Sequence, residues 1–202
     1  MTLARGSRVV VLVLLGAAAA CGSRTASPPE PGTVQGFAPD LRGRRVMVLP
    51  VQQNLGVPGN PDAELAFGLR ERGSAVDWVL PAEVEEVLAR SPAIQANTRG
   101  LQVGQFLAAE VERVGDPLYG QLRRLASLVN ANAVLLPVQA ALAAVPGADP
   151  TVRLWTALID VRSGRVMWFA ILEGDSFPRA DPRGLASAVD ELARTLIWYG
   201  DR

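Results

Sequence analysis

The chain has 202 residues, with 20 basic and 20 acidic side chains, and this balance gives no sign of a nucleic-acid-binding surface. It contains no histidine and no lysine, which argues against Ser–His and Cys–His nucleophiles, lysine Schiff bases, lysine-dependent phosphate loops and most zinc sites. We therefore expect no enzyme, no cofactor and no metal. The hydrophobic fraction of 49% is enough for one globular core.

The amino terminus predicts export. Arg5 and Arg8 precede an apolar run over 9–15, and small residues over 16–20 lead to Cys21, the only cysteine. This pattern is typical of a secretory signal peptide over residues 1–20 and is shorter than the roughly 20 apolar residues of a membrane-spanning helix. A cysteine directly after such a segment resembles a bacterial lipoprotein signal, which implies that the Cys21 thiol is acylated, for instance with palmitate. The preceding alanines also suit ordinary signal peptidase, so simple secretion is the alternative.

A proline-rich stretch follows the cysteine. Residues 21–43 contain several Pro, Gly, Ser and Thr residues and few large apolar side chains, so we expect a lipid-anchored flexible tether. Gly22 lacks the aspartate associated with inner-membrane retention, which favours the periplasmic side of the outer membrane. The folded domain is expected over residues 44–202.

The first half of this domain alternates strands and helices. An apolar strand is predicted over 45–52 and a second over 75–80. Asn60 is a plausible N-cap before Pro61, and this helix is expected to stop at Gly73. Pro81 opens a further short helix that ends before Pro92.

The second half begins with helices predicted over 103–114 and from Asp116 onward, the latter with a buried stripe at Leu118, Leu122, Leu125 and Val129. A strand follows over 133–140, and its Pro137 predicts either an edge strand or a bulge. Two apolar strands joined at 162–164 predict a hairpin with Gly164 in its turn, and a final helix covers 182–199. These elements predict a single α/β domain with a mixed sheet of four or five strands and helices on both faces.

The hairpin carries a resemblance. Residues 158–168 read LIDVRSGRVMW, which resembles the L-I-D-x-x-T/S-G-x-V-x-W signature of a group of bacterial envelope proteins. The group comprises the curli-secretion lipoproteins, the TolB amino-terminal domain and the lipoprotein activators of penicillin-binding proteins. Residues 45–50 and 125–135 agree with it. The resemblance implies a shared fold over most of 44–197. Members of this group act by binding other envelope proteins or by assembling into rings, so the resemblance implies a function of that kind.

One group of residues is a candidate partner-binding surface. A helical wheel places Trp198 away from the buried stripe of the last helix, on the face of Glu191 and Arg194, where an exposed tryptophan could anchor a partner. The alternative is local stacking of Trp198 on Arg194.

Other charged groups receive simpler interpretations. Glu83, Glu85 and Glu86 could act as paired acid and base, but their place in the first turns of a helix favours a dipole effect. The Arg42, Arg44 and Arg45 run could meet anionic head groups or form a solvated surface. Asp160 is expected to cap the hairpin turn.

The resulting hypothesis is a non-catalytic, lipid-anchored envelope protein that binds or regulates another envelope component. Its expected partners are the membrane, through the lipid, and an unidentified envelope protein, and a second copy of the chain is a further candidate. The alternative is a subunit of an oligomeric secretion or transport assembly.

Overall fold

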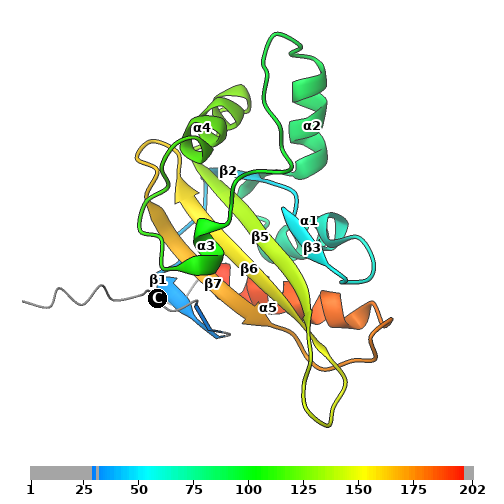
Figure 1. Cartoon of the computed structure of the whole chain (residues 1–202). Helices are drawn as coiled ribbons and strands as arrows, with labels where there is room; N and C mark the ends of the chain where they lie inside the picture. Colours follow the sequence, from blue (N-terminus) through cyan, green and yellow to red (C-terminus); the bar gives the residue numbers. More distant parts are fainter. Residues whose placement is uncertain (1–28, 31, 198–202) are drawn as a thin grey trace, which may run out of the picture.

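The computed structural model describes residues 29–30 and 32–197, which form one mixed α/β sheet structure (Figure 1). The elements in chain order are β1 (Val34–Gly36), β2 (Arg45–Val48), β3 (Gln53–Leu55), α1 (Pro61–Arg72), β4 (Asp77–Val79), α2 (Pro81–Ala89), α3 (Gln105–Ala108), α4 (Leu118–Leu128), β5 (Ala133–Ala143), β6 (Thr151–Asp160), β7 (Val166–Glu173) and α5 (Arg183–Leu196). The α/β class is confirmed. The expected signal peptide and Cys21 lie outside the described residues.

The sheet has seven strands in the order β1-β7-β6-β5-β2-β4, with β3 paired to β5 beyond the end of β2. Pairing is parallel among β2, β3, β4 and β5, and antiparallel from β5 through β6 and β7 to β1. The expectation of four or five strands was too low. The strands that the sequence patterns did not indicate are β1 and β3, each only three residues long.

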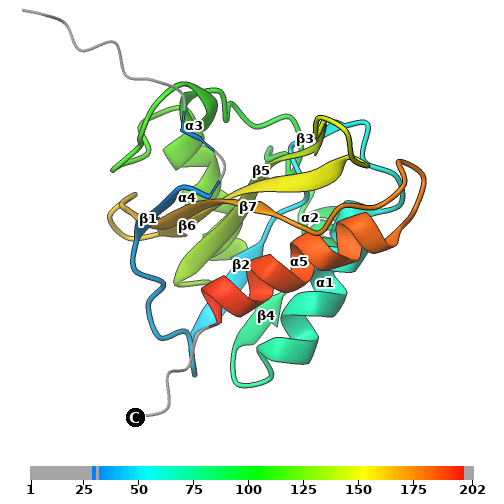
Figure 2. The same cartoon turned by 90° about the horizontal axis from the view of Figure 1, so that it is seen from below.

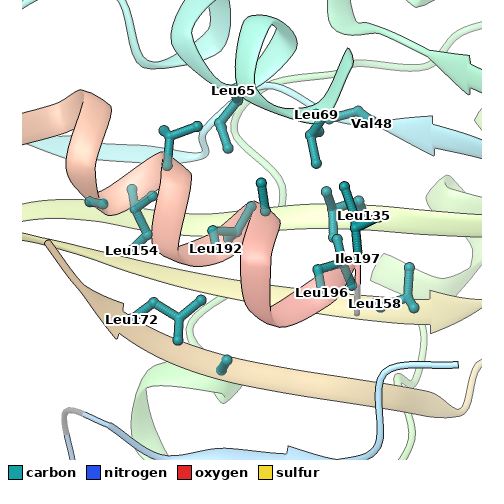
Figure 3. Packing of buried hydrophobic residues seen from close by; sticks show 14 of the residues in the cluster. Val48, Leu65, Leu69, Leu135, Leu154, Leu158, Leu172, Leu192, Leu196 and Ile197 are labelled. Carbon is teal, nitrogen blue, oxygen red and sulfur yellow. The ribbon is translucent and has the colours of Figure 1, made fainter. Parts of the chain in front are cut away.

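Helices cover both faces of the sheet, as predicted. Helices α1 and α5 lie side by side on one face (Figure 2), where Leu65 and Leu69 meet Leu192 and Leu196 over the sheet (Figure 3). Helix α4, the short α3 and the apolar side of α2 cover the opposite face, around Phe106, Leu122 and Leu125. Within the described residues, no helix is long and apolar enough to cross a membrane.

The predicted helix ends are confirmed where side-chain chemistry defines them. Asn60 caps α1 by accepting a hydrogen bond from the backbone N–H of Ala63 (3.2 Å), Pro61 takes the first helical position and Gly73 ends the helix. Helix α5 buries a stripe of apolar side chains, as its helical spacing predicts: Leu185, Val189, Leu192 and Leu196.

The hairpin is also confirmed. Asp160 Oδ1 accepts hydrogen bonds from the Ser163 backbone N–H (2.7 Å) and hydroxyl (2.6 Å), which holds the turn between β6 and β7. Gly164 has φ +70°, a left-handed conformation that glycine adopts without steric cost. Trp168 is 1% exposed, because it lies on a strand with helices or loops over both faces.

The helix expected over 103–114 is wrong. Only residues 105–108 are helical, and the chain then runs beside the start of β7, where Glu112 O accepts from Val166 N–H (2.9 Å) and Val114 N–H donates to Gly164 O (2.8 Å). Residues 112–114 therefore form a short antiparallel bridge with the hairpin. This long-range pairing outweighs the helical spacing of their apolar side chains.

The sequence left two alternatives for the strand that contains Pro137, an edge position or a bulge. Strand β5 lies in the interior of the sheet, and its register with β6 shifts between Pro137 and Gln139. The bulge is confirmed and the edge position is wrong, because the irregularity accommodates a residue that has no N–H to donate.

The expected boundary between tether and domain at residue 44 is too late. Strand β1 pairs with β7 through residues 34–36, and the side chain of Leu41 is completely buried in the core beneath α5. The folded part thus includes residues that had been assigned to the tether.

Candidate protein interaction surfaces

The surface predicted on α5 is partly described. Glu191 pairs with Arg194 one helical turn later and also accepts from the Thr195 hydroxyl (3.3 Å). Asp190 receives two hydrogen bonds from Arg72 of α1, at 2.8 and 2.5 Å. Trp198 lies outside the described residues. The charged groups on this face are therefore paired within the domain, and the anchoring role of Trp198 stays a prediction.

The acidic cluster at the start of α2 lies beside the start of α1, around a hollow of about 330 Å³. Glu83 and Glu85 line this hollow, whereas Glu86 does not. Arg70 pairs with Glu83 (3.2 Å), and Arg99 pairs with Asp62 (2.7 Å) and Glu85 (3.6 Å). Glu86 therefore does not share the hollow with Glu83 and Glu85, and each carboxylate that lines the hollow faces a guanidinium.

Asp62 shows that this cluster supports the fold. Its Oδ1 accepts from the backbone N–H of Val51 (2.7 Å), so it ties the start of α1 to the segment between β2 and β3. Among the residues that the structure describes, no group of three or more His, Cys, Asp or Glu side chains could hold a metal ion.

The basic run before β2 is also engaged within the domain. Arg42 donates to both oxygens of Asp40, and these hydrogen bonds lower the pKa of Asp40 to about 2. Arg45 contacts Asp77 (2.6 Å) and the backbone oxygen of Val129 (2.6 Å). The run is thus largely a surface ion-pair group, in agreement with the simpler interpretation.

A different surface lies at β1, the end of the sheet (Figure 1). Ile171 N–H of β7 donates to Thr33 O (3.0 Å), so the backbone of residue 33 faces β7. Two residues later, Gln35 stands opposite Phe169 and its backbone also faces β7. Because antiparallel pairing alternates, the N–H and C=O groups of Val34 point away from β7. They form an open backbone edge.

Apolar side chains accompany this edge. Phe37 is 94% exposed and Val34 is 48% exposed, which makes them two of the few large apolar residues that the described surface exposes. The β1 strand, Val-Gln-Gly, has no charge and no proline. Native edge strands are commonly protected by charged residues or by proline, which prevent pairing with another chain. Because β1 has neither, its edge is available to another extended chain.

Of the other two edges, one differs from β1 in this respect and one resembles it. Strand β4 carries Asp77, which pairs with Arg45, and this charged pair protects its edge. Strand β3 resembles β1, because its residues Gln53, Asn54 and Leu55 are uncharged and Leu55 is 55% exposed. The sequence patterns indicated neither β1 nor β3, although Val34 and Phe37, as large apolar residues inside a proline-rich stretch, were a signal for β1.

No family model matches the chain, and no curated protein matches it. Solved structures do. A PelC dodecamer from Paraburkholderia phytofirmans is 22% identical with a TM-score of 0.41, over 82% of this chain and 98% of that chain. The LpoB C-terminal domain from Salmonella enterica is 16% identical with a TM-score of 0.41, over 68% and 86%. Lipoprotein GNA1162 from Neisseria meningitidis is 18% identical with a TM-score of 0.39, over 68% and 84%.

These likenesses have low identities and low TM-scores, and they carry no conclusion about the function of this chain.

Proposed function

We propose that this chain is a non-catalytic, lipid-anchored protein on the periplasmic side of the outer membrane that binds another envelope protein. The observation that carries the proposal is the open edge of β1, with outward-pointing backbone groups at Val34 close to the exposed Phe37. An extended segment of the partner would continue the sheet there. Its backbone hydrogen bonds would supply affinity, and contact with Phe37 would supply specificity.

The position of this edge along the chain supports the proposal. Strand β1 follows Cys21 by only about a dozen residues, which span roughly 40 Å when fully extended. An acylated Cys21 would thus hold the edge close to the membrane surface, within reach of envelope partners. The charged residues offer no competing catalytic arrangement in the described part of the chain, since the carboxylates around α1 and α2 are paired with arginines.

The alternative, a subunit of an oligomeric secretion or transport assembly, is favoured by one specific observation. The uncharged edges of β1 and β3 lie on opposite sides of the sheet (Figure 1). Pairing of β1 of one copy with β3 of the next would be a head-to-tail contact, and such contacts generate rings or filaments.

The membrane anchor is tested with Cys21→Ser. The native chain should partition with the membrane fraction, and mass spectrometry should find its first residue to be an acylated Cys21. The Cys21→Ser chain should remain unacylated and lose this partitioning. An unmodified Cys21 in the native chain would contradict the anchor.

The interaction is tested by placing a photoreactive benzophenone amino acid at position 37 in the native envelope, with the same amino acid at the exposed position 90, at the end of α2, as the control. Position 37 should give a defined crosslinked product, and Val34→Pro should abolish it, because proline removes the outward N–H of residue 34. Mass spectrometry of the product then distinguishes another envelope protein from a second copy of this chain. Absence of a product at position 37, or its persistence with Val34→Pro, would contradict strand addition at β1.

A further inference from the structure

A separate hollow of about 690 Å³ lies between α4 and the segment that follows α2. Arg124, Ser127 and Leu128 of α4 form one side, and Ala93, Ile94 and Gln95 form the other. Figure 1 shows this segment passing beside α4 at the top of the view. The volume falls within the range of small-molecule sites in proteins.

Both walls of the hollow are fixed by the fold. Arg124, Ser127 and Leu128 are spaced three and four residues apart on α4, so their side chains lie on one helical face. The opposite segment is held at its start by Ser91 N–H, which donates to Leu88 O (2.9 Å), and at its end by Gln52. The Gln52 amide donates to Thr98 O (2.9 Å) and accepts from Leu101 N–H (3.0 Å).

The hollow combines an apolar surface with one cation. Ile94 is 36% exposed, although it is a large aliphatic side chain, and Leu128 is half-buried beside it. In the part of the chain that the structure describes, no carboxylate pairs with Arg124. Its neighbour Arg123, in contrast, lies over the ring of Tyr119, 5.6 Å from the centroid.

From this combination we propose that the hollow binds an anionic amphiphile, with one carboxylate or phosphate on an apolar chain. The anionic group would pair with the Arg124 guanidinium, and Ser127 and Gln95 offer further polar contacts. The apolar chain would cover Ile94, Leu128 and Ala93. A free fatty acid and an anionic lipid share this chemistry, and the site is independent of the β1 edge proposed above.

The test uses the full chain with Cys21→Ser, so that no acyl group of its own contributes. Its probes are dansyl-labelled undecanoate and the methyl ester of the same compound, followed by fluorescence. The acid should bind saturably and about 3- to 10-fold more tightly than the ester, a range expected for one partly exposed ion pair. Arg124→Ala should remove this difference and bring the affinity for the acid close to that for the ester.

Arg123→Ala is the matched control, because it removes a cation from the adjacent position of the same helix. It should change the affinity for the acid by less than about 2-fold, since its guanidinium lies over Tyr119 and outside the hollow. Ile94→Ser should weaken both the acid and the ester about 10-fold, since it removes apolar contact without changing charge. Circular dichroism and thermal unfolding establish that each variant is folded.

A second set of measurements distinguishes the source of the ligand. If the site takes free fatty acid, undecanoate should displace the probe while phosphatidylglycerol vesicles should not. If it takes lipid, the vesicles should sediment the protein in an Arg124-dependent manner. Two results would overturn the proposal: equal binding of acid and ester by the protein that retains Arg124, or equal effects of Arg123→Ala and Arg124→Ala on binding of the acid. The acid–ester comparison uses only the protein that retains Arg124, so it does not depend on whether Arg124→Ala folds.

Discussion

Gly68 of α1 lies directly against Val189 of α5. A Cβ atom at position 68 would stand 2.5 Å from Val189 Cγ1, well inside van der Waals contact. Because valine is branched at Cβ and its χ1 angle is restricted, this methyl group cannot rotate away freely. The close approach of the two helices on this face of the sheet thus depends on the absence of a side chain at position 68 (Figure 2).

We therefore expect Gly68→Ala to destabilise the domain by about 1–2 kcal/mol, although the same change in an exposed helix normally stabilises it. Urea unfolding measures the difference. Val189→Ala makes room for the new methyl group, so the double variant should be more stable than the two separate losses predict, with a coupling of about 1 kcal/mol. Additive losses would mean that the helices do not meet at this point.

The register of β1 predicts opposite outcomes for two neighbouring prolines. Val34→Pro should change the free energy of unfolding by less than about 1 kcal/mol, because the N–H of residue 34 points away from β7. Gln35→Pro should cost about 2 kcal/mol or more, since it removes an N–H that faces Phe169. Similar losses for the two variants would show that the register is shifted by one residue.

Two buried threonines on β6 offer a matched comparison. Thr156 is completely buried and its hydroxyl has no hydrogen-bond partner among the described residues, whereas the Thr151 hydroxyl donates to Glu173 (2.6 Å). Thr156→Val should leave the free energy of unfolding unchanged or raise it by about 1 kcal/mol, because it removes an unsatisfied polar group. Thr151→Val should lower it by about 1.5–3 kcal/mol, since a hydrogen bond to a carboxylate is lost. Denaturant titrations of both variants decide the comparison.

The lowered pKa of Glu173 predicts that part of the free energy of unfolding depends on pH in the acid range. Burial acts to raise the pKa of this carboxyl, but hydrogen bonds from Thr151 and Arg153 outweigh it and hold the pKa below the ordinary value of 4.5. The ionised carboxylate therefore stabilises the fold above pH 4.5, and this contribution is lost as the pH falls through the folded-state pKa. The stability difference between the native chain and Glu173→Gln should be constant near neutral pH and shrink on acidification to about pH 3. A difference that grows on acidification would reverse the assignment.

Substitution of Trp168 tests whether the hairpin is part of the hydrophobic core. It is 1% exposed on β7 and packs toward α5, so Trp168→Ala should cost about 3–5 kcal/mol. Thermal or urea unfolding gives the value. A loss below about 1 kcal/mol would place this side chain outside the core.

Features that depend on neighbouring residues could be predicted from the amino-acid sequence alone. Asn60 and Pro61 define the start of α1, Asp160 and Gly164 define the hairpin turn, and the four-residue spacing of Leu185 and Val189 defines the buried face of α5. In each case the side chain contacts its own backbone or repeats with the helical period, so local chemistry is sufficient.

The segments that complete the sheet, and the places where its edges are open, became evident only in three dimensions. Residues 109–114 have helical spacing, yet the backbone of residues 112–114 pairs with the hairpin, and three-residue strands such as β1 are too short to show an alternating pattern. The hollow beside Arg124 joins a helix to a segment about 30 residues earlier in the chain. These features depend on hydrogen bonds and contacts between distant residues, and no local pattern encodes which distant segments will meet.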